Sequence, residues 1–314
     1  MTRFILRRLL HMVPVLFGVT VVVFVTIKLI PGSPIAGLLG PGSTPATRAE
    51  LINRLGLNKP IPIQYFDWLR STLEGNFGTS ISFQSSAGTL VFNAFRNTMI
   101  LAGAALILAL VGGFVLGAIG ALWPKGMAGR VTSAISTFSL AIPQYSAGLL
   151  LIVLFSVDHT WLPSGGMHSV TGSTGFADLL RHLVLPALAA GLAPIGVVAR
   201  MFRAALLDVM GQEFVQSMRA RGLRRTTIIR HAIHNTLPAL LTITGLQIGY
   251  LLSGVVFIET IFSWPGLGQL VYGAISARDL PLIQAGVLIS AVAVVLVNVI
   301  VDVAHGFIDP RVRQ

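Results

Sequence analysis

Long apolar segments constrain the fold of this chain more than any other feature of its sequence. A helix needs about 20 consecutive, mostly apolar residues to cross the hydrocarbon core of a bilayer. Six segments meet or approach this length: residues 9–30, 98–122, 131–157, 182–199, 238–261 and 281–304. The fourth is interrupted by Pro186 and Pro194. The sequence therefore predicts an all-α, polytopic membrane protein with about six transmembrane helices.

The composition agrees with a chain embedded in lipid. Hydrophobic residues make up 54% of the 314 residues and charged residues 11%, with a mean hydropathy of +0.81. A soluble domain carries about 25% charged residues, and its surface grows nearly as fast as its mass, so it cannot bury so much apolar area. The chain has no cysteine, which excludes disulfides, thiolate catalysis and cysteine-based metal sites.

The net charge of +11 could suggest nucleic-acid binding, but the basic residues lie beside the apolar segments. Lysine and arginine in short loops mark the cytoplasmic side of a membrane protein. If the chain has six spans, fourteen basic residues lie on one side of the membrane: Arg3, Arg7, Arg8, Lys125, Arg130, Arg200, Arg203, Arg219, Arg221, Arg224, Arg225, Arg230, Arg311 and Arg313. The short loops of the other side hold only Arg181 and Arg278. We therefore expect a multi-pass cell-membrane protein with both termini cytoplasmic and no nucleic-acid partner.

The sequence lacks the common motifs of nucleotide and metal chemistry. It has no G-x-x-x-x-G-K-[ST] and no H-E-x-x-H, so we expect no P-loop and no catalytic role. His231 and His234 are three apart, but two histidines do not make a metal site, and we expect cytoplasmic surface residues. The span interiors contain almost no ionisable residue, and Glu259 and Asp302 lie toward span ends. A charge at the bilayer centre costs about 2.5–3.5 kcal/mol and is usually kept for function, so self-powered secondary transport is disfavoured.

A polar and basic segment, residues 208–224, separates the fourth and fifth spans. The apolar residues Val209, Phe214, Val215 and Met218 give it a partial helical stripe. Gly222 ends the helical pattern as a C′ residue. The sequence predicts a short amphipathic helix that projects into the cytoplasm and presents an apolar ridge to a partner. The alternative is an ordinary solvated loop.

The long segment between the first two spans, residues 31–96, is too polar to cross a membrane. It predicts an amphipathic helix over about residues 47–73, broken at Lys59 and Pro60, that packs over the outer mouth of the bundle.

Several other features admit two interpretations. Trp264-Pro265-Gly266 is either a turn at the outer membrane face or a substrate contact. Glu259 either caps or pairs with Arg278, or contacts substrate. Pro143, within the third span, marks a packing kink or a gate. Gln247 and Asn298 either bond between helices or line a translocation path. The candidates for the path are Gln144, Gln247, Glu259 and Asn298.

Residues 208–224 also resemble the coupling motif of binding-protein-dependent ABC importer permeases, roughly E-A-A-x-x-x-G followed by Leu-Pro. Gln216, Ser217 and Met218 stand at the E-A-A positions, Gly222 matches the glycine, and Leu237-Pro238 match the closing pair. The segment is most similar to the peptide-permease version, with Met218 in place of the usual alanine. The resemblance implies that the ATPase-coupling residues are Glu213, Phe214, Gln216, Ser217, Met218, Arg219, Ala220, Arg221, Gly222 and Leu223.

Further matches to this family follow in order along nearly the whole chain. They are residues 7–10, 31–34 with Ser33 in place of the usual Asp, 55–60, 64–65, 76–80, 161–166, 257–270, 278–284 and 309–313. The chain is similar to the first of the two permeases in a dipeptide, oligopeptide or nickel importer.

The resemblance implies a type I ABC importer transmembrane fold in three parts. Residues 1–95 would hold the first helix and a long extracytoplasmic loop, residues 96–307 the transmembrane domain with the coupling helix, and residues 308–314 a cytoplasmic tail. It also implies a second homologous permease, two ATPase subunits that hold ATP and Mg, and an extracytoplasmic substrate-binding protein; this chain would bind no cofactor. The expected cargo is di- and oligopeptides. The same role for nickel-chelate, glutathione or another small solute stays open, and so does an autonomous channel or secondary carrier.

Overall fold

The structure is a computed structural model of the chain. It describes residues 2–29, 58–170 and 175–308, together with Thr44, Ala46, Ile52, Asn53 and Gly56. These residues are helical apart from their connections and one isolated bridge between Thr79 and Ser86. Five helices are long and apolar enough to cross a membrane, or six if one bent pair counts as a span. The predicted all-α membrane protein is confirmed.

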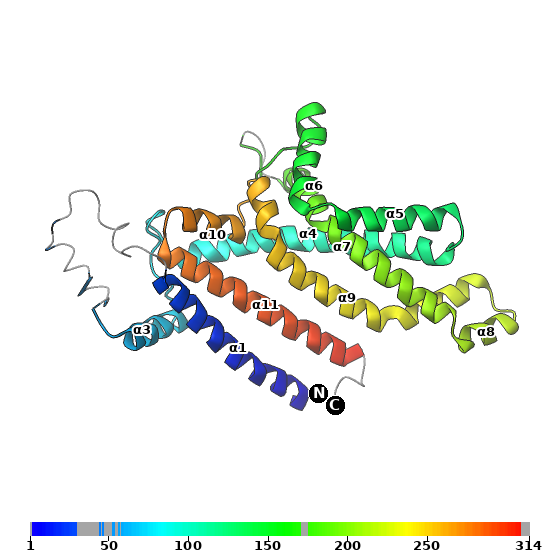
Figure 1. Cartoon of the computed structure of the whole chain (residues 1–314), viewed down its shortest axis with the longest axis horizontal. Coiled ribbons are helices and arrows are strands. Elements are labelled where there is room, and N and C mark those ends of the chain that lie inside the picture. Colours follow the sequence, from blue (N-terminus) through cyan, green and yellow to red (C-terminus); the bar gives the residue numbers. More distant parts are fainter. Residues whose placement is uncertain are drawn as a thin grey trace. The chain divides into compact units, whose positions relative to one another are not determined.

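The helices follow one another as in Figure 1. They are α1 (Thr2–Leu29), α3 (Ile61–Leu73), α4 (Ala87–Leu122), α5 (Met127–Ala141), α6 (Gln144–Ile152) with a π-helical continuation (Val153–Asp158), α7 (Phe176–Met210), α8 (Glu213–Ala220), α9 (Arg225–Ile261), α10 (Leu267–Ser276) and α11 (Leu280–Ile308). The family matches at 31–34 and 309–313, and most of the first half of the helix predicted at 47–73, lie outside the described residues.

Several helices are longer than the apolar segments that predicted them. The fourth span was expected at residues 182–199, but α7 runs through Pro186 and Pro194 from Phe176 to Met210. The fifth was expected to start at Pro238, which instead lies inside α9. A helix satisfies its backbone hydrogen bonds internally, so it need not end where its apolar surface ends. The hydropathy pattern located these spans but set their ends too close together.

The third predicted span, residues 131–157, is not one straight helix. Helices α5 and α6 meet at an angle of 101° (Figure 1). The break falls at Pro143, and Ile142 before it is extended, with φ −82° and ψ 122°. A proline restricts the residue before it to this region and removes a helical N–H. The kink that Pro143 predicted is confirmed, whereas its role as a gate stays a prediction.

The chain divides into two compact units. The first contains Met1–Ile5, Thr98–Trp264 and Leu296–Gln314, and the second contains Leu6–Asn97 and Pro265–Val295. Helices α4 and α11 each contribute to both. The three parts predicted from the sequence, with boundaries at residues 95 and 307, stay a prediction.

Helix α7 forms the centre of the first unit, where it contacts α5, α6 and α9. Its approach to α4 depends on glycine. A Cβ on Gly113 would lie 2.5 Å from the side chain of Val198, and one on Gly117 would lie 2.7 Å from the carbonyl oxygen of Ala199. This Gly-x-x-x-Gly spacing lets two backbones touch, as is common between membrane helices. Close backbone packing therefore holds α4 against α7.

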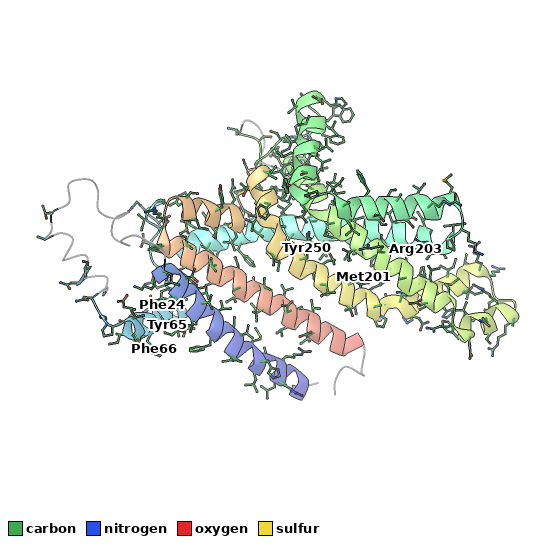
Figure 2. All side chains as sticks on the ribbon, in the orientation of Figure 1. Phe24, Tyr65, Phe66, Met201, Arg203 and Tyr250 are labelled. Atoms are coloured by element: carbon green, nitrogen blue, oxygen red, sulfur yellow. The ribbon has the colours of Figure 1, made fainter. Side chains whose placement is uncertain are left out.

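The second unit has two packing regions. The first turns of α4 pack against α10 and the start of α11 through buried residues that include Val91, Leu267 and Leu282. Helix α3 lies on α1, where the Tyr65 hydroxyl and Thr20 Oγ1 are 2.8 Å apart and the rings of Tyr65 and Phe24 are 5.4 Å apart (Figure 2). Helix α3 begins directly after Pro60, as the predicted break requires.

Candidate functional site: the connection between α7 and α9

The predicted amphipathic helix in the connection between α7 and α9 is α8, Glu213–Ala220. It starts after Gln212, which is extended, with φ −71° and ψ 154°. Glu213 lies in its first turn and Arg219 in its last. Each charge therefore opposes the partial charge of the nearer helix end, which favours this short helix. Its bounds fall inside the predicted segment 208–224.

A glycine-based cap ends α8. The N–H of Gly222 donates to the carbonyl oxygen of Arg219 at 3.0 Å, and the N–H of Leu223 donates to that of Met218 at 3.2 Å. These two bonds define a Schellman motif, which requires its C′ residue in the left-handed region. Gly222 has φ +72°. The prediction of Gly222 as the C′ residue is confirmed.

The apolar side of α8 faces its own chain. Val215 is wholly buried, and Phe214 packs against the buried cluster that contains Val209 and Ala232. Val215 of the predicted ridge is therefore covered by its own chain, whereas Phe214 and Met218 are half-buried, and the presentation of this ridge to a partner stays a prediction. A helical stripe does not tell which neighbour will cover it, and here α7 and α9 do. The side that remains exposed carries Glu213, Gln216, Ser217, Arg219, Ala220, Arg221, Gly222 and Leu223.

The start of α9 also contacts the end of α4. The guanidinium of Arg225 lies 5.9 Å from the centre of the Trp123 ring and donates to the carbonyl oxygen of Leu122 at 3.4 Å. Arg224 and Arg221 are exposed beside it. The connection therefore presents a polar and basic surface, and its contacts with α4, α7 and α9 hold it in place.

Gln144 joins three helices where the third span bends. Its side-chain amide donates to the carbonyl oxygen of Ala190 on α7 at 3.3 Å and to the hydroxyl of Tyr250 on α9 at 3.0 Å. Figure 2 labels Tyr250 on α9. Gln144 therefore bonds between helices, and its part in a translocation path stays a prediction.

The other candidates for the path lie at different places around α9. Gln247 is buried on α9. Glu259 is also buried, and its carboxylate accepts a hydrogen bond from Thr98 Oγ1 of α4 at 2.6 Å. Asn298 of α11 is exposed and lies beside Gly249 of α9. Gly249 and Gln247 are two residues apart, so they lie on different sides of α9. The four candidates do not form one cluster. The pairing of Glu259 with Arg278 stays a prediction.

The turn after α9 is part of the core of the first unit. Trp264 and Phe262 are wholly buried there, and the N–H of Trp264 donates to the carbonyl oxygen of Glu259 at 2.8 Å. The predicted turn is confirmed, and the Trp264 side chain fills the core of the first unit. The position of this turn at the outer membrane face stays a prediction.

The sequence did not show what this turn packs against. Gly166 N–H donates to the carbonyl oxygen of Phe262 at 2.7 Å, and a Cβ on Gly165 would lie 2.5 Å from the same oxygen. The adjacent glycines at 165 and 166 are the signal of this close approach, since a side chain would block it.

A buried carboxylate organises the second unit. Asp279, before α11, accepts hydrogen bonds from Ser80 Oγ at 2.5 Å, from the N–H of Ser82 at 2.9 Å and from the N–H of Leu282 at 3.3 Å. Burial alone raises the pKa of this carboxyl group, but the hydrogen bonds lower it below its usual value overall. An aspartate before Leu-Pro at a helix start was the sequence signal for this cap.

His231 and His234 are both exposed on α9. Within the described ranges, no three histidine, aspartate or glutamate residues are grouped so that they could hold a metal ion.

Comparison with protein families gives two matches that together span most of the chain. Residues 113–314 match the binding-protein-dependent transport system inner membrane component, and residues 1–100 match the N-terminal part of such membrane components.

Three relatives match over the full length of this chain. A di/tripeptide transport system permease protein of Pseudomonas aeruginosa is 38% identical and is covered to 99%. An oligopeptide transport system permease protein of Bacillus subtilis is 35% identical and is covered to 100%. A glutathione transport system permease protein of Salmonella choleraesuis is 33% identical and is covered to 99%.

The fold is also similar to that of a solved transporter. A chain of the MetNI methionine ABC transporter, in an inward-facing conformation, aligns with a TM-score of 0.52 over 72% of this chain and 97% of its own. The sequences are 18% identical in this alignment, so the likeness concerns the fold. It confirms the predicted ABC importer transmembrane fold.

Proposed function

Because the chain belongs to the inner membrane components of binding-protein-dependent transport systems, and is thus a permease subunit of an ABC importer, we propose that its cargo is di- and oligopeptides. The supporting observation is full-length similarity to two peptide permeases at 38% and 35% identity. Glutathione is the second candidate, because a glutathione permease is 33% identical over the same length.

In this proposal, the free energy of ATP hydrolysis is coupled to the helix bundle through the exposed side of α8. Two ATPase subunits with ATP and Mg bind on the cytoplasmic side, and one of them contacts the polar residues of α8, including Glu213, Arg219 and Arg221. Helix α8 is joined to α7 by two residues and packs on the bundle through Val215. A movement of α8 therefore moves the ends of α7 and α9 and shifts the balance between two bundle conformations.

This mechanism sets the topology and the partners. Helix α8 and both termini lie in the cytoplasm, in agreement with the arginines of the connection. A second, homologous permease completes the path, and an extracytoplasmic binding protein delivers the cargo. The chain itself holds no cofactor and catalyses no reaction.

The coupling role is tested in proteoliposomes that contain the complete transporter and its binding protein. Gly222→Glu places a side chain in the left-handed region and a negative charge on the basic surface, and no atom lies within 4 Å of the added Cβ. We expect dipeptide uptake and cargo-stimulated ATP hydrolysis to fall at least ~10-fold, equivalent to ~1.4 kcal/mol.

Gly126→Glu is the matched control. Gly126 lies in the α4–α5 connection, has φ −87°, and a Cβ there would approach only a backbone oxygen at 3.8 Å. Its uptake should stay near that of the unmodified protein. Normal uptake by the Gly222→Glu transporter contradicts the coupling role of α8.

Cargo class is tested in the same vesicles by competition. Unlabelled di- and tripeptides should displace a labelled dipeptide, while glutathione and nickel-chelate should displace it weakly. The reverse order overturns the cargo assignment without affecting the coupling proposal. Uptake by this chain alone, without ATP, would instead identify an autonomous channel or carrier.

A further inference from the structure

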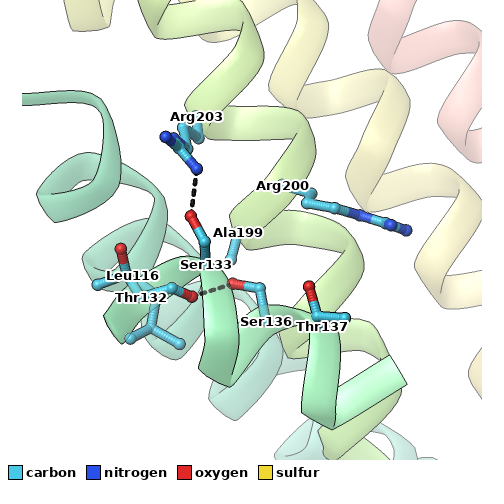
Figure 3. A pocket seen from close by; sticks show the side chains of 8 residues that line it. All are labelled: Leu116, Thr132, Ser133, Ser136, Thr137, Ala199, Arg200 and Arg203. Carbon is cyan, nitrogen blue, oxygen red and sulfur yellow. Dashed lines mark hydrogen bonds between the residues drawn. The ribbon is translucent and has the colours of Figure 1, made fainter. Parts of the chain in front are cut away.

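A pocket in the first unit lies between α4, α5 and α7, apart from the proposed coupling surface and the candidates for the path. Its cavity volume is about 210 Å³ (Figure 3). A water molecule takes up about 30 Å³, so the cavity has room for several water-sized groups. The lining residues are Leu116, Thr132, Ser133, Ser136, Thr137, Ala199, Arg200 and Arg203. The lining thus contains two arginines and four hydroxyl groups but no carboxylate.

Arg203 lacks a full set of partners in this pocket. Its guanidinium donates to Ser133 Oγ, a neutral acceptor, and its buried Nε has no hydrogen-bond partner among the described residues. A guanidinium is always charged and offers five donors in a plane. A buried donor without an acceptor costs about 1–3 kcal/mol, and more when it is charged. This cation is therefore positioned to accept an external anion.

The backbone around the pocket accommodates Arg203. A Cβ on Gly120 of α4 would lie 3.1 Å from Arg203 Cδ and 3.0 Å from Thr132 Oγ1. The absence of a side chain at this position leaves space for the arginine stem between the helices.

The hydroxyl groups on α5 are themselves fixed. Ser133 Oγ donates to the carbonyl oxygen of Gly129 at 2.8 Å, and Ser136 Oγ donates to that of Thr132 at 2.8 Å. The remaining lone pair of Ser133 Oγ therefore accepts from Arg203, and a neutral hydroxyl group does not neutralise its charge.

The second arginine stands at the edge of the same pocket. Arg200 is exposed, and Figure 3 shows its side chain extended away from Ser133 while Arg203 reaches towards it. Two guanidinium groups one helical turn apart on α7 can thus contact one anion, Arg203 from inside and Arg200 from the mouth.

We propose that this pocket binds a phosphate oxyanion through Arg203 Nε and the guanidinium of Arg200. Planar guanidinium donors match the oxygens of phosphate better than a point charge does. Arg203 lies seven residues before Met210, about 10 Å along α7 at about 1.5 Å per residue. In the topology proposed above, this depth suits the headgroup of an anionic lipid in the cytoplasmic leaflet, where basic pockets between helices hold such groups. Free phosphate offers the same chemistry.

The test compares variants of the purified transporter complex by native mass spectrometry. The complex is released from neutral-detergent micelles that contain equal amounts of phosphatidylglycerol and phosphatidylcholine. The unmodified complex should retain phosphatidylglycerol selectively. Arg203→Gln should lower this retention about tenfold, equivalent to about 1.4 kcal/mol, and Arg203→Lys should lower it less because the charge remains while Nε is lost. Arg200→Gln should also lower it and leaves the buried packing intact.

Arg130→Gln is the matched control, because Arg130 is exposed on α5 and does not line the pocket. It removes the same charge and should not change retention. In a second arm, inorganic phosphate is titrated into lipid-depleted complexes while the thermal unfolding midpoint is measured. Selective lipid retention that depends on Arg203 and Arg200 assigns the headgroup.

A phosphate-dependent rise in the midpoint that both arginine variants abolish, without lipid selectivity, assigns free phosphate. The proposal is overturned if Arg200→Gln and Arg203→Gln complexes match the unmodified complex in both arms, or if Arg130→Gln reduces retention as strongly as they do.

Discussion

The two connections that flank α9 differ in what surrounds them. The connection before it, residues 211–224, and the turn after it, residues 262–266, are both short, and both contain a residue in the left-handed region, Gly222 with φ +72° and Ser263 with φ +47°. The first is exposed along most of its length, while Phe262 and Trp264 of the second are wholly buried. Backbone conformation alone therefore does not separate a structural turn from an interaction surface, whereas burial does.

The difference assigns separate tasks to the two ends of one helix. Helix α9 has 37 residues, or about 55 Å at about 1.5 Å per residue. Its second end is packed into the core of the first unit, so changes there should affect folding. Its first end carries mostly exposed charge, so changes there should affect coupling more than folding. The following experiments test this division.

The largest effect is expected at the buried turn. Trp264→Ala leaves a large cavity in the core of the first unit and should destabilise the protein by about 3–5 kcal/mol. The measurement is the thermal unfolding midpoint of the purified complex in detergent. Trp161→Ala is the control, since Trp161 is 61% exposed and should shift the midpoint much less. Equal shifts for the two tryptophans would remove burial as the distinguishing feature.

A substitution of Asp279 tests the connection between α10 and α11 in the second unit. Hydrogen bonds hold its pKa below the usual value. A carboxyl group whose pKa is lower in the folded state stabilises the fold at pH values above its unfolded-state pKa of about 3.9. This contribution is lost as the pH falls through the lower, folded-state pKa. Asp279→Asn should therefore lower stability by about 1–3 kcal/mol at neutral pH and flatten the decline in acid.

Chemical denaturation across pH measures this effect. Asp67→Asn is the control, because Asp67 pairs with Lys59 at 2.7 Å on an exposed surface, and exposed pairs contribute about 0–1 kcal/mol. If Asp279→Asn keeps the acid decline of the unmodified protein, another group is responsible for it.

The sequence predicted those parts of the fold that depend on local pattern. Apolar length located the spans, Pro143 located the break between α5 and α6, and Gly222 located the end of α8. The ends of α7 and α9 could not be predicted, because Pro186, Pro194 and Pro238 suggested boundaries that the folded helices pass through. Packing against neighbours outweighed the local preference at these prolines.

The candidate sites were less predictable because they depend on distant partners. Gln144 bonds Tyr250, which lies 106 residues away in the sequence, and no local pattern relates the two. The stripe at Phe214 and Val215 predicted an amphipathic helix but not which of its sides faces the bundle. The polar residues of α8 were named by resemblance to a family motif, and the burial of Val215 places them on the exposed side of the helix.

A smaller and strictly local effect is expected at Gly222. A β-branched residue in the left-handed region costs about 1–2 kcal/mol, but nothing lies within 4 Å of an added Cβ. Gly222→Val should therefore disturb the cap of α8 and reduce uptake several-fold, while the unfolding midpoint of the bundle stays nearly constant. Gly222→Asn is the control, since asparagine tolerates this region. A large drop in midpoint with Gly222→Val would mean that the first connection also belongs to the core.

The smallest effect is expected where the exposed connection contacts α4. Arg225 lies over the Trp123 ring with 5.9 Å between guanidinium and ring centre, a contact worth about 0.5–1 kcal/mol at an exposed site. A double-mutant cycle with Arg225→Gln and Trp123→Leu, read by chemical denaturation, should return a coupling energy in this range. The same cycle with Arg224→Gln should return about zero, because Arg224 is exposed and has no described ring contact. A coupling energy well above this range would show that the connection is held to α4 as firmly as the turn at Trp264 is held in its core, and the division between the two ends of α9 would then fail.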